Sequence, residues 1–270
     1  MLISHAGPNR IYFNDGQANF KVSDHGFGKA GDEYLWVTLA DVDRDGNMDA
    51  FIFSISSASR LLLNDGRGVF RMTAQEYGGS HAKGYELADL NGDSFPDLIL
   101  IMRQKPNQIW MNNGAGKFID SGKTVGIGGY DIECQDCNGD GKIDIVIADS
   151  PGSSRIWLNE SNTGTFKGGY TIDEGALKCK LVDVDRDGDF DLITADPKNG
   201  NKLWLNDGRS NFNYSGQVFG TKRVLRIACD DLDGDGDTDV VLGQIEGSGG
   251  HAIYFNESIR KKQKKLSAKK

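Results

Sequence analysis

The chain has 270 residues, with 31 basic and 39 acidic side chains and a formal net charge of −8. It holds 36 glycines but only 5 prolines, which excludes collagen and proline-rich disordered chains. An acidic chain is a poor candidate for nucleic-acid binding. No apolar run approaches the roughly 20 residues of a membrane span, and the first twenty residues lack the apolar block of a signal peptide.

An acidic string of the form D-x-[DN]-x-D-[GS]-x-x-D repeats along the chain at intervals of 47 or 48 residues. A second string, apolar-x-apolar-Asn followed by a turn, recurs in phase with it, from IYFNDG at 11–16 to IYFNES at 253–258. The acidic strings open at Asp41, Asp89, Asp136, Asp183 and Asp231. Two motifs that repeat in phase identify an array of equivalent structural units.

Each unit contains the pattern of four short strands. Alternating apolar residues such as Val37 and Leu39 precede the acidic loop and predict a first strand. A continuous apolar run follows the loop, as at 98–101, and suits a second strand buried on both faces. The aromatic stretch that ends in Asn predicts a third strand. A tight turn then leads to a fourth strand around a phenylalanine such as Phe70 or Phe118.

Repeats of roughly 40–50 residues with four antiparallel strands are typical of propeller blades. The sequence therefore predicts an all-β fold, a β-propeller of four-stranded antiparallel blades. Residues 1–257 are expected to form a single β-propeller domain, and residues 258–270 a basic, disordered C-terminal tail. Residues 9–20 supply a third and a fourth strand with nothing before them. Five blades, the last completed by this segment, are the most economical count; six blades or a fragment of a longer array are the alternatives.

The acidic loops predict metal sites. In the loop from Asp41 to Asp49, oxygens at positions 1, 3 and 5 point inward, the glycine at position 6 permits a sharp turn, and position 7 offers a carbonyl. Flexible cages of hard oxygen ligands suit calcium better than magnesium. An EF-hand is excluded because position 12 is not Glu. Ordinary acidic turns are the alternative, but five loops in register favour about five structural calcium ions.

The expected ligands occupy positions 1, 3, 5, 7 and 9 of each loop. Position 7 contributes its backbone carbonyl, and the Asp at position 9 is expected to close each cage as a bidentate ligand. Because the second loop has Ser94 in place of glycine and Pro96 at position 8, we expect it to be the weakest site. The ligands are Asp41, Asp43, Asp45, Asn47 and Asp49; Asp89, Asn91, Asp93, Phe95 and Asp97; Asp136, Asn138, Asp140, Lys142 and Asp144; Asp183, Asp185, Asp187, Asp189 and Asp191; and Asp231, Asp233, Asp235, Asp237 and Asp239.

The strings ADVDRDGNMD and RLLLNDGRGVF resemble the FG-GAP/VCBS repeats of integrin α-subunit propellers and bacterial surface proteins, over about residues 9–256. The resemblance implies a calcium-stabilised propeller, usually extracellular or at the cell surface. It also implies a protein or glycan ligand on the rim opposite the calcium loops. The phenylalanine–glycine pair of the family survives only in places, such as Phe27-Gly28 and Phe219-Gly220.

No catalytic constellation is present: the chain has neither H-E-x-x-H nor G-x-S-x-G, and Gly122-Lys123-Thr124 lacks the first glycine of a phosphate loop. We expect no catalytic residues and a non-enzymatic binding or adhesion module for a protein or a glycan. The alternatives are a calcium-dependent lectin with sugar pockets between blades and a polysaccharide-acting enzyme with its site at the channel mouth. Residues expected on the ligand face are Trp36, His81, Arg103, Lys105, Tyr170 and Lys198.

Two further patterns predict contacts between blades. Tryptophans at equivalent third-strand positions are expected to pack between blades rather than to form sugar platforms: Trp110, Trp157 and Trp204. Charged residues at matching positions of two successive first strands are expected to pair: Asp131 and Glu133 with Lys178 and Lys180.

Overall fold

A computed structural model describes residues 2–3, 10–23, 34–172, 174–244 and 251–257. The regular structure of these residues is β-sheet, apart from one 3-10 helix at Gly79–His81. The chain divides into two compact units, Met1–Gly128 and Gly129–Lys270. The basic tail predicted at 258–270 lies outside the described residues, and the single domain predicted over 1–257 stays a prediction.

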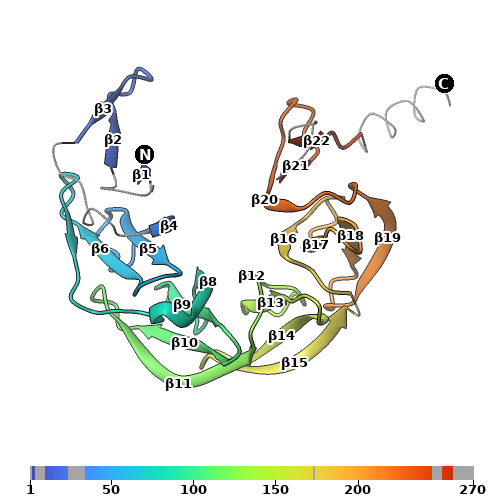
Figure 1. Cartoon of the computed structure of the whole chain (residues 1–270), viewed down its shortest axis with the longest axis horizontal. Coiled ribbons are helices and arrows are strands. Elements are labelled where there is room, and N and C mark those ends of the chain that lie inside the picture. The colour runs from blue at the N-terminus through green and yellow to red at the C-terminus, as the bar shows by residue number, and fades with distance from the viewer. Residues whose placement is uncertain (1, 4–9, 24–33, 173, 245–250, 258–270) are drawn as a thin grey trace. The chain divides into compact units, whose positions relative to one another are not determined.

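Unit 1 contains two four-stranded antiparallel sheets and one three-stranded sheet. In Figure 1 its sheets follow one another in chain order, from blue to green. The four-stranded sheets are β4 (Tyr34–Ala40), β5 (Asp49–Ser54), β6 (Arg60–Asn64) and β7 (Phe70–Met72), then β8 (Ala82–Ala88), β9 (Asp97–Met102), β10 (Pro106–Asn112) and β11 (Phe118–Ile127). The three-stranded sheet is β1 (Leu2–Ile3), β2 (Arg10–Asn14) and β3 (Phe20–Val22).

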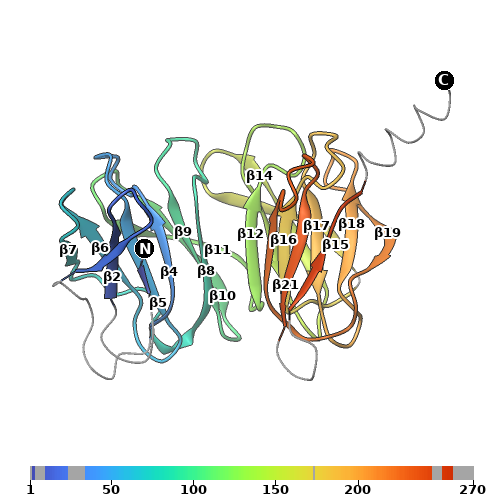
Figure 2. The same cartoon turned by 90° about the horizontal axis from the view of Figure 1, so that it is seen from above.

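Unit 2 repeats this design, and Figure 2 shows its strands side by side with their turns gathered at two opposite ends. Its four-stranded sheets are β12 (Asp131–Gln135), β13 (Asp144–Ala148), β14 (Ser154–Ser161) and β15 (Thr165–Ile172), then β16 (Lys178–Val182), β17 (Asp191–Ala195), β18 (Lys202–Asn206) and β19 (Phe212–Val218). The last sheet has three described strands: β20 (Val224–Asp230), β21 (Asp239–Gln244) and β22 (Ala252–Tyr254).

Every four-stranded sheet is an up-and-down meander in which each strand pairs with its chain neighbours. This confirms the predicted fold, a β-propeller of four-stranded antiparallel blades. Within the described residues β2 pairs with both β1 and β3, so the expectation that no strand precedes residues 9–20 is wrong, and β22 lies at the edge of its sheet. The completion of the last blade by residues 9–20 stays a prediction.

The core lies between successive sheets. The second strands β5, β9, β13 and β17 are buried along their whole length, as their continuous apolar runs predict. The first Phe of a fourth strand reaches into the space between its own sheet and the preceding one. Phe118 is fully buried there, with its ring centroid 6.2 Å from that of Phe51 and 5.6 Å from that of Tyr77. Burial of one such ring contributes about 1.5–3 kcal/mol.

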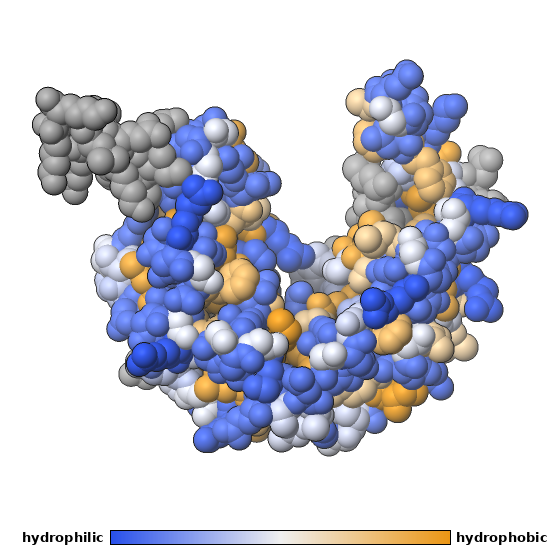
Figure 3. All heavy atoms as spheres, turned by 180° about the vertical axis from the view of Figure 1, so that it is seen from behind, coloured by the Kyte–Doolittle hydropathy of each residue, from blue (hydrophilic) through white to orange (hydrophobic). Residues whose placement is uncertain are grey.

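Two of the three tryptophans make the expected kind of contact. The Trp110 ring lies edge-on to Tyr77 at 5.5 Å, and the Trp204 indole packs against a core cluster drawn from the sheets β12–β15 and β16–β19. Packing of Trp157 between blades stays a prediction. Lys178 Nζ lies 3.0 Å from Asp131 Oδ1, and Lys180 Nζ lies 2.8 Å from Glu133 Oε2. Both predicted ion pairs therefore form, and they join β12 to β16. Outside the core, hydrophilic residues cover most of the face shown in Figure 3.

Candidate functional site

The five acidic loops share one backbone design. At position 6 the backbone φ is positive in all five, from 71° at Ser94 to 100° at Gly188. Position 4 is also left-handed, at Arg44, Gly92, Gly139, Arg186 and Gly234. Glycine adopts such angles at little cost, so the glycines of the repeat are needed for the fold of the loop itself.

Ser94 is the one position-6 residue that carries a side chain at this strained angle, with a φ of 71°. We expect Ser94→Gly to stabilise the protein by about 1 kcal/mol, because a left-handed non-glycine residue costs roughly 1–2 kcal/mol. Urea unfolding of the two proteins in calcium measures the difference. A substitution to Ala, which keeps the strain, serves as the control and should give no gain. A Ser94→Gly protein less stable than the parent would contradict this reading of the loop.

Hydrogen bonds inside each loop turn the odd-numbered side chains toward a common centre. The position-1 carboxylate accepts the N–H of position 6 at 2.7–3.2 Å in all five loops. The side-chain oxygen of position 3 accepts the N–H of position 5, and that of position 5 accepts the N–H of position 7. These hydrogen bonds arrange the side-chain oxygens of positions 1, 3 and 5 around a common centre.

Carboxylate oxygens from three residues lie within 4.8 Å of one another in three of the loops. The groups are Asp41, Asp43 and Asp45; Asp183, Asp185 and Asp191; and Asp231, Asp233 and Asp239. In the first group Asp41 Oδ1 is buried and has no hydrogen-bond partner among the described residues. Like charges this close repel, and a hard divalent cation would balance them. The donor set therefore fits calcium.

The Asp at position 9 holds the loop on its sheet. In the first loop Asp49 Oδ2 accepts the N–H of Val42 at 3.0 Å, and its Oδ1 accepts the N–H of Asn64 at 2.8 Å. The other four loops repeat both bonds, through Asp97, Asp144, Asp191 and Asp239. All five carboxylates are buried. The sequence predicts these five residues only as metal ligands and gives no sign of their hydrogen bonds. Their bidentate coordination of a metal stays a prediction.

Burial raises the pKa of Asp97, Asp144 and Asp191 to about 6, and repulsion from the other loop carboxylates adds to the effect. Burial likewise raises the pKa of Asp49. Hydrogen bonds from the backbone N–H groups oppose these shifts without cancelling them. Without a metal, the position-9 carboxyls Asp97, Asp144 and Asp191 therefore take up protons at a higher pH than ordinary Asp side chains do.

In a chelator we expect the protein to be more stable near pH 5 than at pH 7.5. The folded carboxyls, with a raised pKa, hold protons that the unfolded chain releases near pH 4, so this stabilisation is lost as pH rises through about 6. The loss is on the order of 1–2 kcal/mol per carboxyl. Urea unfolding in EDTA at the two pH values measures it. A chelated protein that is more stable at pH 7.5 would contradict the expectation, and saturating calcium should reverse the trend.

The Asn that ends a third strand ties two acidic loops together. Asn112 Nδ2 donates to Val42 O at 2.8 Å, in the loop of the preceding sheet, and to Pro96 O at 2.9 Å, in the loop of its own sheet. Unit 2 repeats the contact with the preceding loop: Asn206 to Cys137 O and Asn256 to Val184 O, both at 2.8 Å. The sequence shows that this Asn recurs in every repeat, but it predicts only a role for the Asn in the turn, not a contact with the neighbouring loop.

The residues expected on the ligand face come together only in part. The acidic loop joins β8 to β9 at the end of the sheet where Ala88 pairs with Asp97. The opposite end of the sheet is the one where Ala82 pairs with Met102. At that opposite end lie His81, Arg103 and Lys105, all exposed, and the N–H of Arg103 donates to His81 O at 2.7 Å.

The other three expected residues lie apart from this group. Trp36 stacks on Phe53 with ring centroids 5.3 Å apart and packs against the core of unit 1, so its ring serves packing. Tyr170, on β15, is 43% exposed. Lys198 is exposed in the turn between β17 and β18. A ligand role for these residues stays a prediction.

No helix among the described residues is long and apolar enough to cross a membrane.

Comparisons with known proteins bear on the repeats and on the fold. The family model of the FG-GAP-like repeat matches residues 1–52 and 183–242. A search of curated proteins found no match to the chain.

Two solved structures show the shared fold. The chain is similar to an Agrocybe aegerita lectin solved for its recognition of non-reducing terminal N-acetylglucosamine, with a TM-score of 0.63 and 21% identity over 94% of this chain and 72% of the lectin chain. It is also similar to BBS1N in complex with ARL6DN, from a crystal soaked with mercury, with a TM-score of 0.53 and 12% identity over 94% of this chain and 76% of that one. Sheet order and fold agree: the chain is a β-propeller, and its residues 1–52 and 183–242 match the FG-GAP-like repeat.

Proposed function

We propose that this chain is a calcium-stabilised, non-enzymatic binding module of the extracellular type, which holds a protein or glycan partner on the rim opposite its acidic loops. The observation that carries the proposal is the contrast between the two ends of the sheets. At one end the same loop is built five times, down to individual hydrogen bonds. At the other end the turns differ in sequence from sheet to sheet, as recognition loops on a rigid scaffold do.

The variable turns are fixed in place by buried amides. Asn107 Oδ1 accepts the N–H of Met102 at 2.9 Å, and its Nδ2 donates to Gly128 O at 2.8 Å. Asn201 is buried in the corresponding turn of β17 and β18, where its Nδ2 donates to Phe219 O at 3.3 Å. Such turns present Arg103, Lys105 and Lys198 to solvent without a large entropy cost on binding.

A non-enzymatic role is proposed because the sequence carries no recognisable catalytic motif. The extracellular assignment is supported by the calcium loops, since sites of this loop class with affinities of about 0.1–1 mM fill only at extracellular calcium levels. The similar lectin, whose structure concerns N-acetylglucosamine recognition, supports a glycan as one possible ligand class.

The test is binding of the folded protein to a glycan array and to an array of extracellular protein domains, in about 1 mM calcium, with an EDTA-treated sample in parallel. The Arg103→Ala/Lys105→Ala double variant probes the variable rim. Lys167→Ala is the matched control, because Lys167 is exposed at the other end of its sheet, beside the turn between β14 and β15.

Binding that the double variant loses and the control keeps would support the rim as the ligand face. Defined sugars as the targets would assign a lectin, and a protein target would assign an adhesion module. Binding that survives the double variant unchanged would place the ligand site elsewhere. Turnover of a bound glycan would contradict the non-enzymatic proposal.

A further inference from the structure

The third acidic loop, residues 136–144, carries less negative charge than the other four. Its five expected ligand positions hold three Asp, one Asn and one Lys, which gives them a net formal charge of −2. The same positions carry −4 in the first loop, −3 in the second and −5 in both the fourth and the fifth. The basic residue is Lys142 at position 7, where the other loops have Asn, Phe or Asp.

The Lys142 ammonium contacts the oxygens of its own loop. Its Nζ donates to Oδ2 of Asp140, the position-5 residue, at 2.9 Å, and the two side chains are only 26% and 34% exposed. A hydrogen bond between two ionised groups is stronger than one between neutral groups, and partial burial reduces its screening by water. Asp140 is an expected calcium ligand, so the ammonium competes with the metal for the same oxygen.

The backbone satisfies the position-1 carboxylate of this loop. Asp136 Oδ1 accepts the N–H of Gly139 at 2.8 Å, and its Oδ2 accepts the N–H of Gly141 at 2.7 Å. In the first loop the equivalent Oδ1 of Asp41 is buried without a hydrogen-bond partner in the described chain. The groups of three carboxylates within 4.8 Å that the described residues form come from the first, fourth and fifth loops, not from the third.

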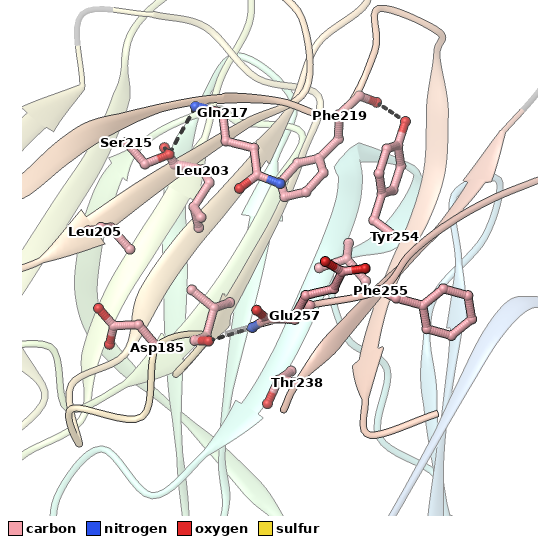
Figure 4. Close-up of a pocket in the computed structure, with 13 residues that line it drawn as sticks. Asp185, Leu203, Leu205, Ser215, Gln217, Phe219, Thr238, Tyr254, Phe255 and Glu257 are labelled. Atoms are coloured by element: carbon pink, nitrogen blue, oxygen red, sulfur yellow. Dashed lines mark hydrogen bonds between the residues drawn. The ribbon is translucent and has the colours of Figure 1, made fainter. Parts of the chain in front are cut away.

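The first and fourth loops have no such internal cation. Between described residues, no ion pair involves a carboxylate of either loop. The Arg44 guanidinium of the first loop lies instead over the Phe95 ring, 5.4 Å from its centroid. In the fourth loop the Asp185 carboxylate lies at the edge of a pocket of about 370 Å³, and neither Lys nor Arg is among the 13 described residues that line it (Figure 4).

We propose that Lys142 is a tethered cation that takes the place of calcium in the third loop. In the metal-free protein its ammonium supplies the positive charge that the first, fourth and fifth loops lack, and calcium must displace it in order to bind. The third loop is therefore a weaker calcium site than those three loops, and its local fold depends less on calcium. This inference rests on the proposed calcium role of the acidic loops.

The chemistry of lysine suits a counter-charge that calcium can displace. An ammonium is a compact charge on a flexible four-carbon stem, so it can leave the loop without a change in the backbone. It carries one charge and three donors, whereas calcium carries two charges and gathers six to eight oxygens. Millimolar calcium can therefore still fill the third loop, but only after the contact between Lys142 and Asp140 is broken.

The variant that tests the inference is Lys142→Met, which keeps an unbranched side chain and removes the charge. We expect one of the weak sites of the full chain to bind calcium about tenfold more tightly in this variant, because a nearby positive charge no longer opposes the ion. An equilibrium calcium titration measures the change. The double variant Lys142→Met/Asp140→Ala should lose the gain, which assigns it to the third loop.

In EDTA the same Lys142→Met variant should unfold at a lower urea concentration than the parent, because the carboxylates of the loop lose their counter-charge. The charge thus has opposite effects with and without calcium, which a lysine that serves only packing would not show. Lys117→Met is the matched control: Lys117 is exposed in the turn between β10 and β11, and its loss should change neither measurement.

Hydrogen exchange of the parent chain in EDTA gives a test that does not depend on the folding of a variant. Residues 136–144 should keep their amide protection, whereas residues 183–191 of the fourth loop, with five carboxylates, should lose it. Equal loss in both loops would overturn the inference, and so would a Lys142→Met chain that matches the parent in both measurements. If the other loops still bind calcium, only this inference fails. A parent chain that binds no calcium would contradict the proposed function as well.

Discussion

Calcium at 1 mM is expected to raise the melting temperature of this protein by about 10 °C or more over that in EDTA. With a dissociation constant of about 0.1 mM, each filled loop adds about 1.4 kcal/mol to the free energy of unfolding. Five loops would add about 7 kcal/mol, which is comparable with the whole stability of a typical domain, about 5–15 kcal/mol. Two of the loops lie in unit 1 and three in unit 2.

Differential scanning calorimetry in calcium, in EDTA and in magnesium measures this effect. Magnesium should stabilise less, because it requires a tight octahedron and keeps its waters. Added NaCl of matched ionic strength is the control for simple screening of the loop charges. Identical melting curves in calcium and EDTA would show that the acidic loops are ordinary turns.

Asp49→Ala should destabilise the protein by about 2–5 kcal/mol in EDTA, and by about a further 1.4 kcal/mol in calcium, because the calcium site of this loop is lost as well. The buried Asp49 carboxylate accepts the N–H groups of Val42 and Asn64 at 3.0 and 2.8 Å, and its removal leaves one buried and one half-buried donor without an acceptor. Asp45→Ala, in the same loop, removes an exposed carboxylate of the oxygen cluster. It should cost only the calcium increment, about 1.4 kcal/mol, and nearly nothing in EDTA.

Urea unfolding of both variants with and without calcium separates the two roles. Asp49→Asn, which keeps one acceptor oxygen, should fall between the parent and Asp49→Ala. If Asp49→Ala were harmless in EDTA, position 9 would be only a metal ligand. If Asp45→Ala cost as much in EDTA as Asp49→Ala, the exposed cluster would have a structural role that its geometry does not explain.

The repeat made most of the fold predictable. Because the acidic string and the Asn turn recur in phase, one unit defines all the others, and the burial of β9 or β13 follows from its apolar run. The pairing of Lys178 with Asp131 and of Lys180 with Glu133 was predictable for the same reason, since residues at matching repeat positions lie side by side in a stack of blades.

The contacts that join one loop to another sheet could not be read from the sequence. Asn112 and Val42 are 70 residues apart, and an Asn that opens an Asn-Asn-Gly turn is fully explained by turn chemistry alone. The two hydrogen bonds that Asp49 accepts could not be predicted either, because an Asp at position 9 is fully explained as an expected metal ligand.

The most direct test of this account is an equilibrium calcium titration of the folded protein, by flow dialysis or with a calcium electrode, at pH 7.5. We expect about five sites per chain, one for each acidic loop, with dissociation constants in the range of about 0.01–1 mM. The second loop, with Ser94, should be the weakest, and its loss in Asp93→Ala should remove one site. A folded chain that binds no calcium at millimolar concentration would contradict the central claim that the repeated loops are calcium sites.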